Sequence, residues 1–428
     1  MQRLSEPAGF FAGLGGSVTV AIHSGCAEPP VLSRQLAAQA AAMKGAQLLT
    51  LMPMGDPAWA GEAATGQFDV TTFFPGRGLR VALDQGRARA LRYPLSAIPG
   101  LFDRGEIEVD VLLLQVSEPD ASGRVSLGVS VDYMPAVLAQ SPLVVAEINP
   151  RMPRTCGDST LHVSQIALCI DAAEPPQPLP PAAGDEVDRR IAQHVAGLLD
   201  DGAVLQIGIG SVPDQVLSGL AHLKHLGLHS GIVTDAVRPL IETGVIDNST
   251  KARFTGVSVT TMAAGTQDFY DFLHRNRAIE FHSCALTHDR ALLATIDGLC
   301  AINSALQIDL AGRVNAETAN GRRISLPGGL PDFAAGASRA RGGKSIIALR
   351  SSFAKGAQSN IVARLGDGAP VTVGPDVVDF VVTEYGVAAL RGTTLAERAR
   401  ALVAVAHPQH RERLEREFAA RAGPEVAR

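Results

Sequence analysis

A short stretch in the middle of the chain, LGLHSGIVTDAV at residues 226–237, carries residues that could do chemistry. It sets His229, Ser230 and Asp235 between apolar runs, and these are the residue types of a nucleophile with its base and an orienting carboxylate. His229 and Ser230 are adjacent, however, and neighbouring side chains on a strand point to opposite faces, so the two make a poor pair. Gly231, in the middle, has no side chain that could react.

A glycine-rich turn precedes this stretch. AVLQIG at residues 203–208 has the continuous apolar character of a buried strand, Gly208 and Gly210 follow, and Pro213 suits the first turn of a helix. A strand, a glycine-rich turn and a helix start form an arrangement that binds anions, because free backbone N–H groups point outward. The turn has neither the Gly-Lys-Ser/Thr of a Walker A loop nor a full G-x-G-x-x-G, so tight packing alone is an alternative explanation.

Two further segments have residue types that suit a thioester or a phosphate. PGGLP at Pro327–Pro331 predicts irregular backbone, and its adjacent glycines would let backbone N–H groups approach a ligand and stabilise an oxyanion, although a plain turn is the alternative. An apolar segment further on carries basic residues that could surround a phosphate or simply mark a solvated strand edge: Lys344, Arg350, Lys355 and Arg364.

The strands and helices that we expect to position these residues alternate along the sequence. Residues 110–117 and 143–149 are short continuous apolar runs, which is typical of strands buried on both faces, and helical spacing over Pro30–Met43 lies between such runs. Strands that alternate with helices predict parallel sheets covered by helices, hence an α/β fold.

A chain of 428 residues exceeds what one hydrophobic core usually serves, so we expect two domains. The composition shifts to proline, alanine and acidic residues over 171–188, as is common in linkers. We therefore predict two similar open α/β domains, residues 1–180 and 189–428, with the second carrying the glycine-rich loops.

Charge and composition exclude several classes of protein. The net charge is −5 without a long basic run, which argues against nucleic-acid binding. No signal peptide and no run of about 20 apolar residues is visible, so we expect a cytoplasmic protein without a membrane segment. The five cysteines have no Cys-x-x-Cys spacing and the eleven histidines no ligand spacing, so we expect reduced thiols and no metal.

Motifs along almost the whole chain, from about residue 18 to 415, resemble those of the acetyl-CoA hydrolase/transferase family. They occur in order and include CAEPPVL, VSEPDASGRVSLGVSVDY, LQIGIGSVPDQVL, INSALQIDLAGRVNAE, GGLPDFAAGAS, GGKSIIAL and VVTEYGVAALRG. The resemblance is to 4-hydroxybutyrate and butyryl-CoA:acetate CoA-transferases.

The resemblance implies an acyl-CoA:carboxylate CoA-transferase with its active site at the domain interface, acyl-CoA as substrate and a homodimeric or homotetrameric assembly. In such enzymes a glutamate attacks the thioester and is converted to a glutamyl-CoA thioester. The family's motifs transfer an oxyanion and thioester role to Gly328, Gly329 and Asn315. They transfer CoA binding to Gln206, Gly208 and Gly210, and we add Lys355 as a phosphate contact.

One motif departs from the family at its nucleophile. The family stretch resembles GIHSEMISDGV, and GLHSGIVTDAV aligns with it without a gap, so Gly231 stands where the glutamate is expected. Leu330 likewise replaces a glutamine after the paired glycines.

Three hypotheses follow. Another carboxylate could attack, with Glu28 favoured over Glu62, Glu317 and Asp235. Alternatively the acceptor, of the acetate, butyrate, succinate or itaconate class, attacks the thioester directly in space cleared above Gly231. In the third, the protein is an acyl-CoA hydrolase or a catalytically altered CoA-binding relative. We favour a transferase by either of the first two routes.

Overall fold

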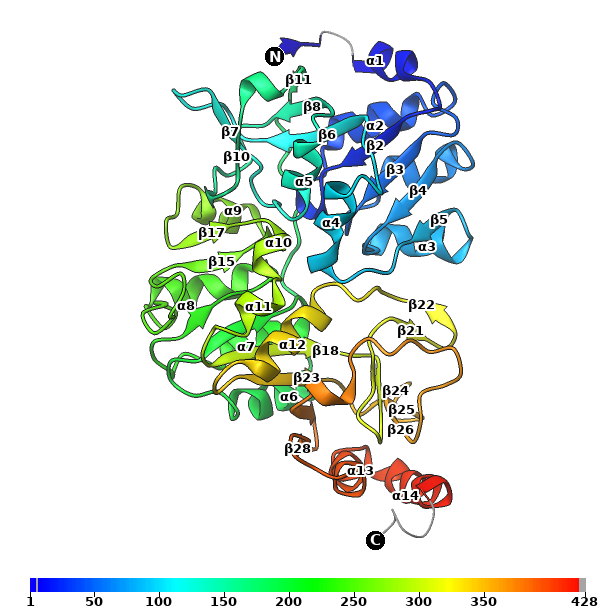
Figure 1. Cartoon of the computed structure of the whole chain (residues 1–428), viewed down its shortest axis with the longest axis vertical. Coiled ribbons are helices and arrows are strands. Elements are labelled where there is room, and N and C mark those ends of the chain that lie inside the picture. Colours follow the sequence, from blue (N-terminus) through cyan, green and yellow to red (C-terminus); the bar gives the residue numbers. More distant parts are fainter. Residues whose placement is uncertain (5–6, 423–428) are drawn as a thin grey trace. The chain divides into compact units, whose positions relative to one another are not determined.

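The computed structural model describes residues 1–4 and 7–422, which form two compact units (Figure 1). Unit 1 comprises Met1–Pro180, Ile232–Asp235 and Val259–Thr287, and unit 2 comprises Pro181–Gly231, Ala236–Ser258 and His288–Arg428. The chain leaves unit 1 at Pro180, inside the proline-rich segment, but it returns to unit 1 twice. The two units are therefore not separated by a single boundary in the sequence.

Unit 1 is built on an eight-stranded sheet in which every pair of neighbours is parallel. Its order is β1 (Gln2–Arg3), β11 (Leu168–Asp171), β8 (Leu143–Ile148), β6 (Val111–Val116), β2 (Thr19–Ile22), β3 (Gln47–Thr50), β4 (Asp69–Thr72) and β5 (Ala88–Ala90). The two predicted apolar runs are β6 and β8, which are almost wholly buried, as expected for central parallel strands.

Helices between these strands complete unit 1. They include α1 (Pro7–Leu14), α2 (Pro30–Ala38), α3 (Arg80–Asp84), α4 (Ile98–Asp103) and α5 (Met134–Ala139), with α9 (Gln267–Leu273) and α10 (Cys284–Thr287) from the later segment. Helix α2 starts at the predicted Pro30 but ends before the predicted Met43. Beyond Ala38 the N–H groups of Ala40 and Met43 bond to carbonyls three residues back, so the chain tightens into turns.

A buried carboxyl group lies in the middle of unit 1. Glu147 on β8 is fully buried; its Oε1 accepts a hydrogen bond from Leu32 N at 2.6 Å, and its Oε2 has no hydrogen-bond partner within the described part of the chain. Burial raises the pKa of the Glu147 carboxyl from 4.5 to about 8. The folded protein therefore holds a proton here that the unfolded chain loses above about pH 4.5.

We expect Glu147→Gln to become progressively stabilising, relative to the unchanged protein, as the pH rises from 5 to 8. A carboxyl whose folded pKa is raised contributes its full stability below the unfolded pKa and loses it towards the folded pKa, at up to about 1.36 kcal/mol per pH unit. Chemical unfolding at pH 5 and pH 8 measures the difference, with the exposed Glu108→Gln as control. Equal effects of Glu147→Gln at both pH values would contradict this.

Unit 2 contains a six-stranded sheet. Its order is β13 (Gly227–Leu228), β12 (Val204–Ile207), β18 (Leu299–Ser304), β23 (Lys344–Ala348), β27 (Phe380–Thr383) and β28 (Gly386–Ala389), and all neighbours are parallel except β27 and β28. Both units are thus α/β with largely parallel sheets, which confirms the predicted fold class.

Unit 2 also contains helices, some of which pack on this sheet. They include α6 (Glu186–Ala196), α7 (Ser211–Ser218), α8 (Arg238–Glu242), α11 (Arg290–Leu293) and α12 (Leu330–Arg339). Leu293 of α11 and Phe333 of α12 share one buried cluster with Val204 and Leu299 of the strands. This packing fixes the first turn of α12, which matters for the site described below.

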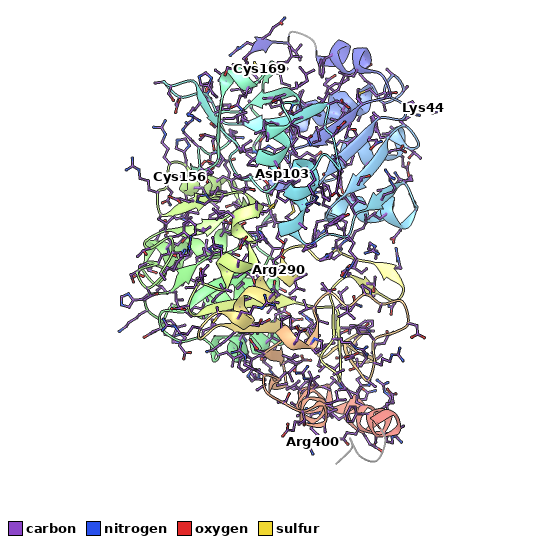
Figure 2. All side chains as sticks on the ribbon, viewed as in Figure 1. Lys44, Asp103, Cys156, Cys169, Arg290 and Arg400 are labelled. Carbon is purple, nitrogen blue, oxygen red and sulfur yellow. The ribbon has the colours of Figure 1, made fainter. Side chains whose placement is uncertain are left out.

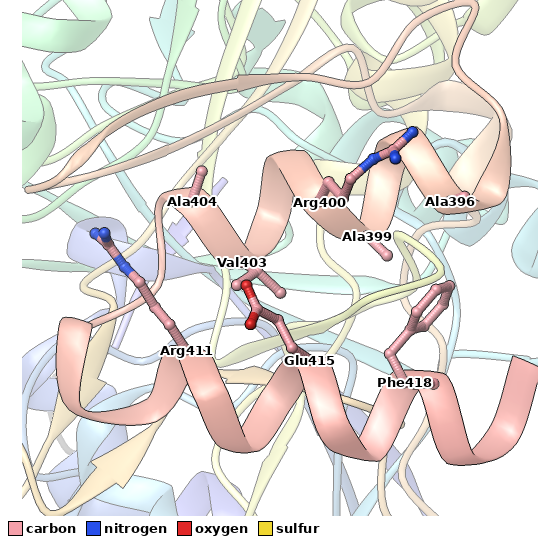
Figure 3. Close-up of a pocket in the computed structure, with 9 residues that line it drawn as sticks. Ala396, Ala399, Arg400, Val403, Ala404, Arg411, Glu415 and Phe418 are labelled. Carbon is pink, nitrogen blue, oxygen red and sulfur yellow. The ribbon is translucent and has the colours of Figure 1, made fainter. Parts of the chain in front are cut away.

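Two last helices, α13 (Leu395–Ala404) and α14 (Pro408–Ala422), run side by side at the end of unit 2. They line a groove of about 540 Å³. Figure 3 shows Val403 and Phe418 along it, with the carboxylate of Glu415 pointing between the two helices beside Val403. None of the predicted site residues lines this groove. Within the described residues, no helix is long and apolar enough to cross a membrane.

Candidate active site

The carboxyl ends of the parallel strands in unit 2 gather the polar groups of the site. Gln206 of β12 and Asn303 of β18 exchange amide hydrogen bonds of 3.3 and 2.7 Å. Ser230, after β13, donates to the carbonyl of Ile207 at 2.8 Å and accepts from its N–H at 3.2 Å. The Ser230 hydroxyl thus joins two strand ends. Ligands of open parallel sheets bind at this edge.

A cavity of about 430 Å³ opens at this edge, and the glycine-rich turn lines it. Gly210 has φ +128°, a conformation that side chains disfavour, and it leads directly into α7, whose first residues also line the cavity. Apolar walls come from Ile209, Leu306 and Phe353. A cavity with backbone N–H groups at one end and apolar walls suits a phosphorylated ligand with an organic body.

A basic residue that lines this cavity is Arg350, which is ion-paired with Asp188 and Asp185 at 2.7 and 2.9 Å. Lys355, the predicted phosphate contact, lies in an exposed turn after β24 (Ser352–Phe353) and does not line the cavity. Asn315 is buried and its side chain folds a local turn, donating to Thr318 O at 2.8 Å. The structure therefore brings Gly210 into the cavity and leaves these other two residues outside it.

The paired glycines form the entry to α12. Gly328 has φ +58°, and Gly329 is the N-cap residue of the helix. Irregular backbone was predicted up to Pro331, but α12 already begins at Leu330, with Pro331 in its first turn, where a missing N–H costs nothing. Leu330 packs into an apolar core of unit 2.

The space directly above Gly231 is occupied. A Cβ built on Gly231 would lie 2.7 Å from Nε2 and 3.0 Å from Cε1 of His288, and 3.5 Å from the ring of Phe333. A Cβ built on Gly329 would lie 2.6 Å from the same Nε2. The His288 imidazole is therefore packed against two residues that lack side chains, and it stands where a side chain at position 231 would begin. The cleared space that the sequence suggested for an acceptor or for water is filled at this point.

The elements around His288 hold its ring in place. Phe333 of α12 meets it edge to face, with ring centres 4.8 Å apart. Asp289 caps α11 by accepting from Leu292 N at 2.7 Å, and Arg290 (labelled in Figure 2) donates to the fully buried Asp332 of α12 at 2.8 Å. The histidine thus precedes a short helix that is tied to the first turn of α12.

Burial also determines the charge of this histidine. The side chain is 1% exposed, and desolvation lowers the pKa of His288 to about 3. The imidazole is consequently neutral at physiological pH, with one ring N–H donor and one acceptor nitrogen.

Glu28, the favoured replacement nucleophile, lies in unit 1. It is half-buried and lines a cavity of about 450 Å³ together with Ser33, Arg34 and Gln177. Its Oε1 accepts hydrogen bonds from Ser33 Oγ at 2.9 Å and from Trp59 Nε1 at 2.8 Å. Burial raises the pKa of the Glu28 carboxyl above its ordinary value.

The other carboxylates considered have structural contacts or are exposed. Asp235 accepts from Thr266 Oγ1 at 2.5 Å and from its N–H at 3.0 Å, and so supports the start of α9. Glu317 is fully buried and accepts from Thr372 Oγ1 at 2.8 Å. Glu62 is exposed in a 3-10 turn of unit 1.

Among the described residues, no cluster of three or more histidine, cysteine or acidic side chains could hold a metal ion. Within the described part of the chain the five cysteines form no disulfide, and two of them, Cys156 and Cys169, are labelled in Figure 2.

Sequence reasoning missed His288, which was one of eleven scattered histidines. Its importance depends on a contact between residues 57 positions apart, and no local spacing encodes that contact. The one available signal is indirect: a glycine in place of a long side chain leaves a volume that a close-packed interior must fill from elsewhere.

Comparisons with known proteins agree with this architecture. Residues 4–181 match the acetyl-CoA hydrolase/transferase N-terminal domain, and residues 265–418 match the C-terminal domain. The 4-hydroxybutyrate coenzyme A transferase of Clostridium kluyveri is 41% identical over 374 residues, 87% of each chain, and the succinyl-CoA:acetate/propanoyl-CoA:succinate CoA transferase of Fasciola hepatica is 36% identical over 95% of this chain and 85% of its own. The crystal structure of 4-hydroxybutyrate CoA-transferase from Porphyromonas gingivalis has a TM-score of 0.81, with 32% identity over 98% of each chain. This chain therefore belongs to the acetyl-CoA hydrolase/transferase family.

Proposed function

We propose that this protein is an acyl-CoA:carboxylate CoA-transferase that moves CoA between a short-chain or dicarboxylic acyl-CoA and a free carboxylate. The observation that carries the proposal is the cavity at the carboxyl edge of the unit 2 sheet, where Gly210 and the start of α7 line one end, in a chain of this family. Backbone N–H groups there would bind CoA phosphates, and the apolar walls would accept its organic part. Gln206 and Gly208 contribute by shaping the strand end and turn.

We propose further that the acceptor carboxylate attacks the thioester directly, without a covalent enzyme intermediate. Gly231 offers no nucleophile, and Oε1 of Glu28 is held by hydrogen bonds from Ser33 and Trp59. Gly328 and Gly329 place backbone N–H groups at the start of α12, where they can stabilise the oxyanion. Asn315 would act on the thioester only if its turn opened, and Lys355 could contact a phosphate only outside the cavity.

Glu28→Gln is expected to keep the transfer rate within about threefold of the unchanged protein. The amide oxygen can still accept the hydrogen bonds from Ser33 and Trp59, and no nucleophile would be lost. Steady-state kcat with butyryl-CoA and acetate measures this. A loss of more than about 100-fold, together with loss of a hydroxylamine-sensitive enzyme adduct, would instead assign the covalent route to Glu28.

The function itself is tested by incubating the protein with butyryl-CoA, with and without acetate, and separating the CoA species. Transfer predicts acetyl-CoA and butyrate in equal amounts, with little free CoA and a strict need for acetate. Free CoA released at one rate with or without acetate would overturn the proposal and establish a hydrolase. The same reaction with succinyl-CoA and with itaconate as acceptor defines the range of acids.

Hydrolysis is the second candidate because the family includes acetyl-CoA hydrolases and Gly231 provides no group to trap the acyl chain. The His288 ring fills the space beside Gly231 for water as it does for an acceptor, so the need for acetate in the assay above is what separates the two candidates.

We also infer a cytoplasmic homodimer or homotetramer, on the resemblance to family members alone. Light scattering on the purified protein checks the assembly, and a monomeric mass would contradict it.

A further inference from the structure

The cavity at the carboxyl edge of the unit 2 sheet is lined by two groups that suit anions. One is the start of α7, where Gly210 and Ser211 line the cavity and the helix has unused backbone N–H groups. The other is Arg350, which alone among the described lining residues has a basic side chain. Its side chain is 42% exposed, so a ligand in the cavity can reach it.

Two carboxylates at the start of α6 fix the direction of the Arg350 guanidinium. Nε and Nη2 donate to Oδ1 of Asp188 at 3.0 and 2.7 Å, and Nη2 lies 2.9 Å from Oδ2 of Asp185. The Asp188 side chain is only 2% exposed, so this edge of the guanidinium is held rigidly. No hydrogen bond within the described residues uses Nη1, whose N–H groups therefore remain available to a ligand.

The two carboxylates leave part of the positive charge of Arg350 effective. Asp185 is the N-cap residue of α6, and its Oδ1 accepts from the N–H groups of Val187 and Asp188 at 2.9 and 3.1 Å. The positive end of the helix dipole offsets some of the negative charge of carboxylates placed there. Asp185 is also 57% exposed, so water screens its charge. Arg350 can thus still attract an anion.

A ligand that uses both groups needs phosphates in two places, and CoA has them. Its pyrophosphate suits the N–H groups of a helix start, and its ribose carries a separate 3′-phosphate. A phosphate monoester has nearly two negative charges at pH 7 and three acceptor oxygens, which match an arginine that is already oriented. Phe353 lines the same cavity and offers a ring on which a base can stack. The cavity therefore suits the nucleotide end of CoA.

We propose that Arg350 recognises the 3′-phosphate of CoA through the N–H groups of Nη1, while the start of α7 holds the pyrophosphate. This deepens the proposed function and rests on its assignment of CoA to this cavity. Arg350 then makes the protein selective for CoA over dephospho-CoA, which has the same pantetheine thiol but lacks the 3′-phosphate.

The test measures the affinities of CoA and dephospho-CoA by calorimetry. We expect the unchanged protein to bind dephospho-CoA about 30-fold more weakly than CoA, because a charge-assisted contact is lost. Arg350→Gln removes the charge but can still donate to Asp188, and it should bind both ligands equally, with the affinity that the unchanged protein has for dephospho-CoA. Arg413→Gln is the matched control, since Arg413 is half-exposed and pairs with Glu417 on α14; it should keep the 30-fold difference.

Turnover provides the same comparison. For transfer to acetate we expect Arg350→Gln to lower kcat/KM about 30-fold with butyryl-CoA and by less than about threefold with butyryl-dephospho-CoA. Arg350→Lys keeps a cation beside the buried Asp188 but loses the planar fork, so it should discriminate between the two ligands by only about threefold to tenfold. It provides the test if Arg350→Gln does not fold, which thermal unfolding of each variant shows.

The proposal is overturned if the unchanged protein binds CoA and dephospho-CoA within about threefold of each other, or if folded Arg350→Gln and Arg350→Lys discriminate between them as strongly as the unchanged protein does. It is also overturned if folded Arg350→Gln binds both ligands more weakly by the same factor, since Arg350 would then act on another part of CoA or through the fold. Failure of the proposed function is separate, because it would appear as release of free CoA at one rate with or without acetate, whatever the two affinities.

Discussion

Gly231→Glu is expected to inactivate the protein rather than to restore a family nucleophile. The new Cβ would stand 2.7 Å from Nε2 of His288, a buried ring held against Phe333, so either the ring or the backbone must move. Overpacking of this kind costs about 1–3 kcal/mol of unfolding free energy, and a displaced ring would press on Gly329, a proposed oxyanion donor, so kcat should fall on the order of 100-fold. Chemical unfolding and the acetate-dependent transfer assay measure the two effects.

A double variant isolates the cause. Gly231→Glu combined with His288→Gly removes the ring that the new side chain meets, so we expect the pair to be more stable than the sum of the single effects, with a coupling of about 1 kcal/mol or more. Gly366→Glu is the matched control, because Gly366 lies exposed in unit 2 with nothing within 4 Å of an added Cβ. If Gly231→Glu alone were as stable and active as the unchanged protein, His288 would not occupy the position described.

Among changes away from Gly231, Gly329 and His288, we expect Arg290→Met to lower the free energy of unfolding and kcat the most. Arg290 donates to Asp332, which is fully buried, so its removal leaves that carboxylate without this cation. Breaking a wholly buried pair costs about 3–5 kcal/mol, and because the Arg290 side chain is 45% exposed we expect about 2 kcal/mol. Asp332 lies in the first turn of α12, directly after the proposed oxyanion donors Gly328 and Gly329, so kcat should also fall roughly tenfold.

Arg341→Met serves as the comparison for Arg290→Met. Arg341 pairs with Asp297, but both side chains are largely exposed, so its loss should change the unfolding free energy by less than about 0.5 kcal/mol. Equal effects of Arg290→Met and Arg341→Met in urea unfolding would show that the pair between α11 and α12 does not stabilise the site.

The fold could be predicted because its signals are local. The apolar runs at 110–117 and 143–149 are the strands β6 and β8, and AVLQIG contains β12, since a strand buried on both faces needs a continuous apolar run. Boundaries were less predictable: α2 ends at Ala38 because its last turns tighten, and α12 begins at Leu330 although Pro331 follows. The two returns of the chain to unit 1 depend on tertiary contacts that no local pattern records.

The site was predictable only in part, for the same reason. Gly210 could be recognised because a glycine-rich turn between strand and helix has a sequence signature. Asn315 belongs to a recognisable motif and Lys355 to a basic segment, yet local hydrogen bonds and loop geometry decide where their side chains go. His288 could not be recognised, because its contact with Gly231 exists only after the sheet of unit 2 has formed.

The central claim, direct transfer without a protein carboxylate, is tested most directly by following oxygen in a single turnover. Enzyme in excess over butyryl-CoA is mixed with acetate carrying ¹⁸O in both oxygens, and the released butyrate is analysed by mass spectrometry. Direct attack places one acetate oxygen in the anhydride and leaves it on butyrate, so we predict butyrate with one ¹⁸O alongside acetyl-CoA. Unlabelled butyrate accompanied by acetyl-CoA would contradict the claim, because the oxygen would then have come from an enzyme carboxylate.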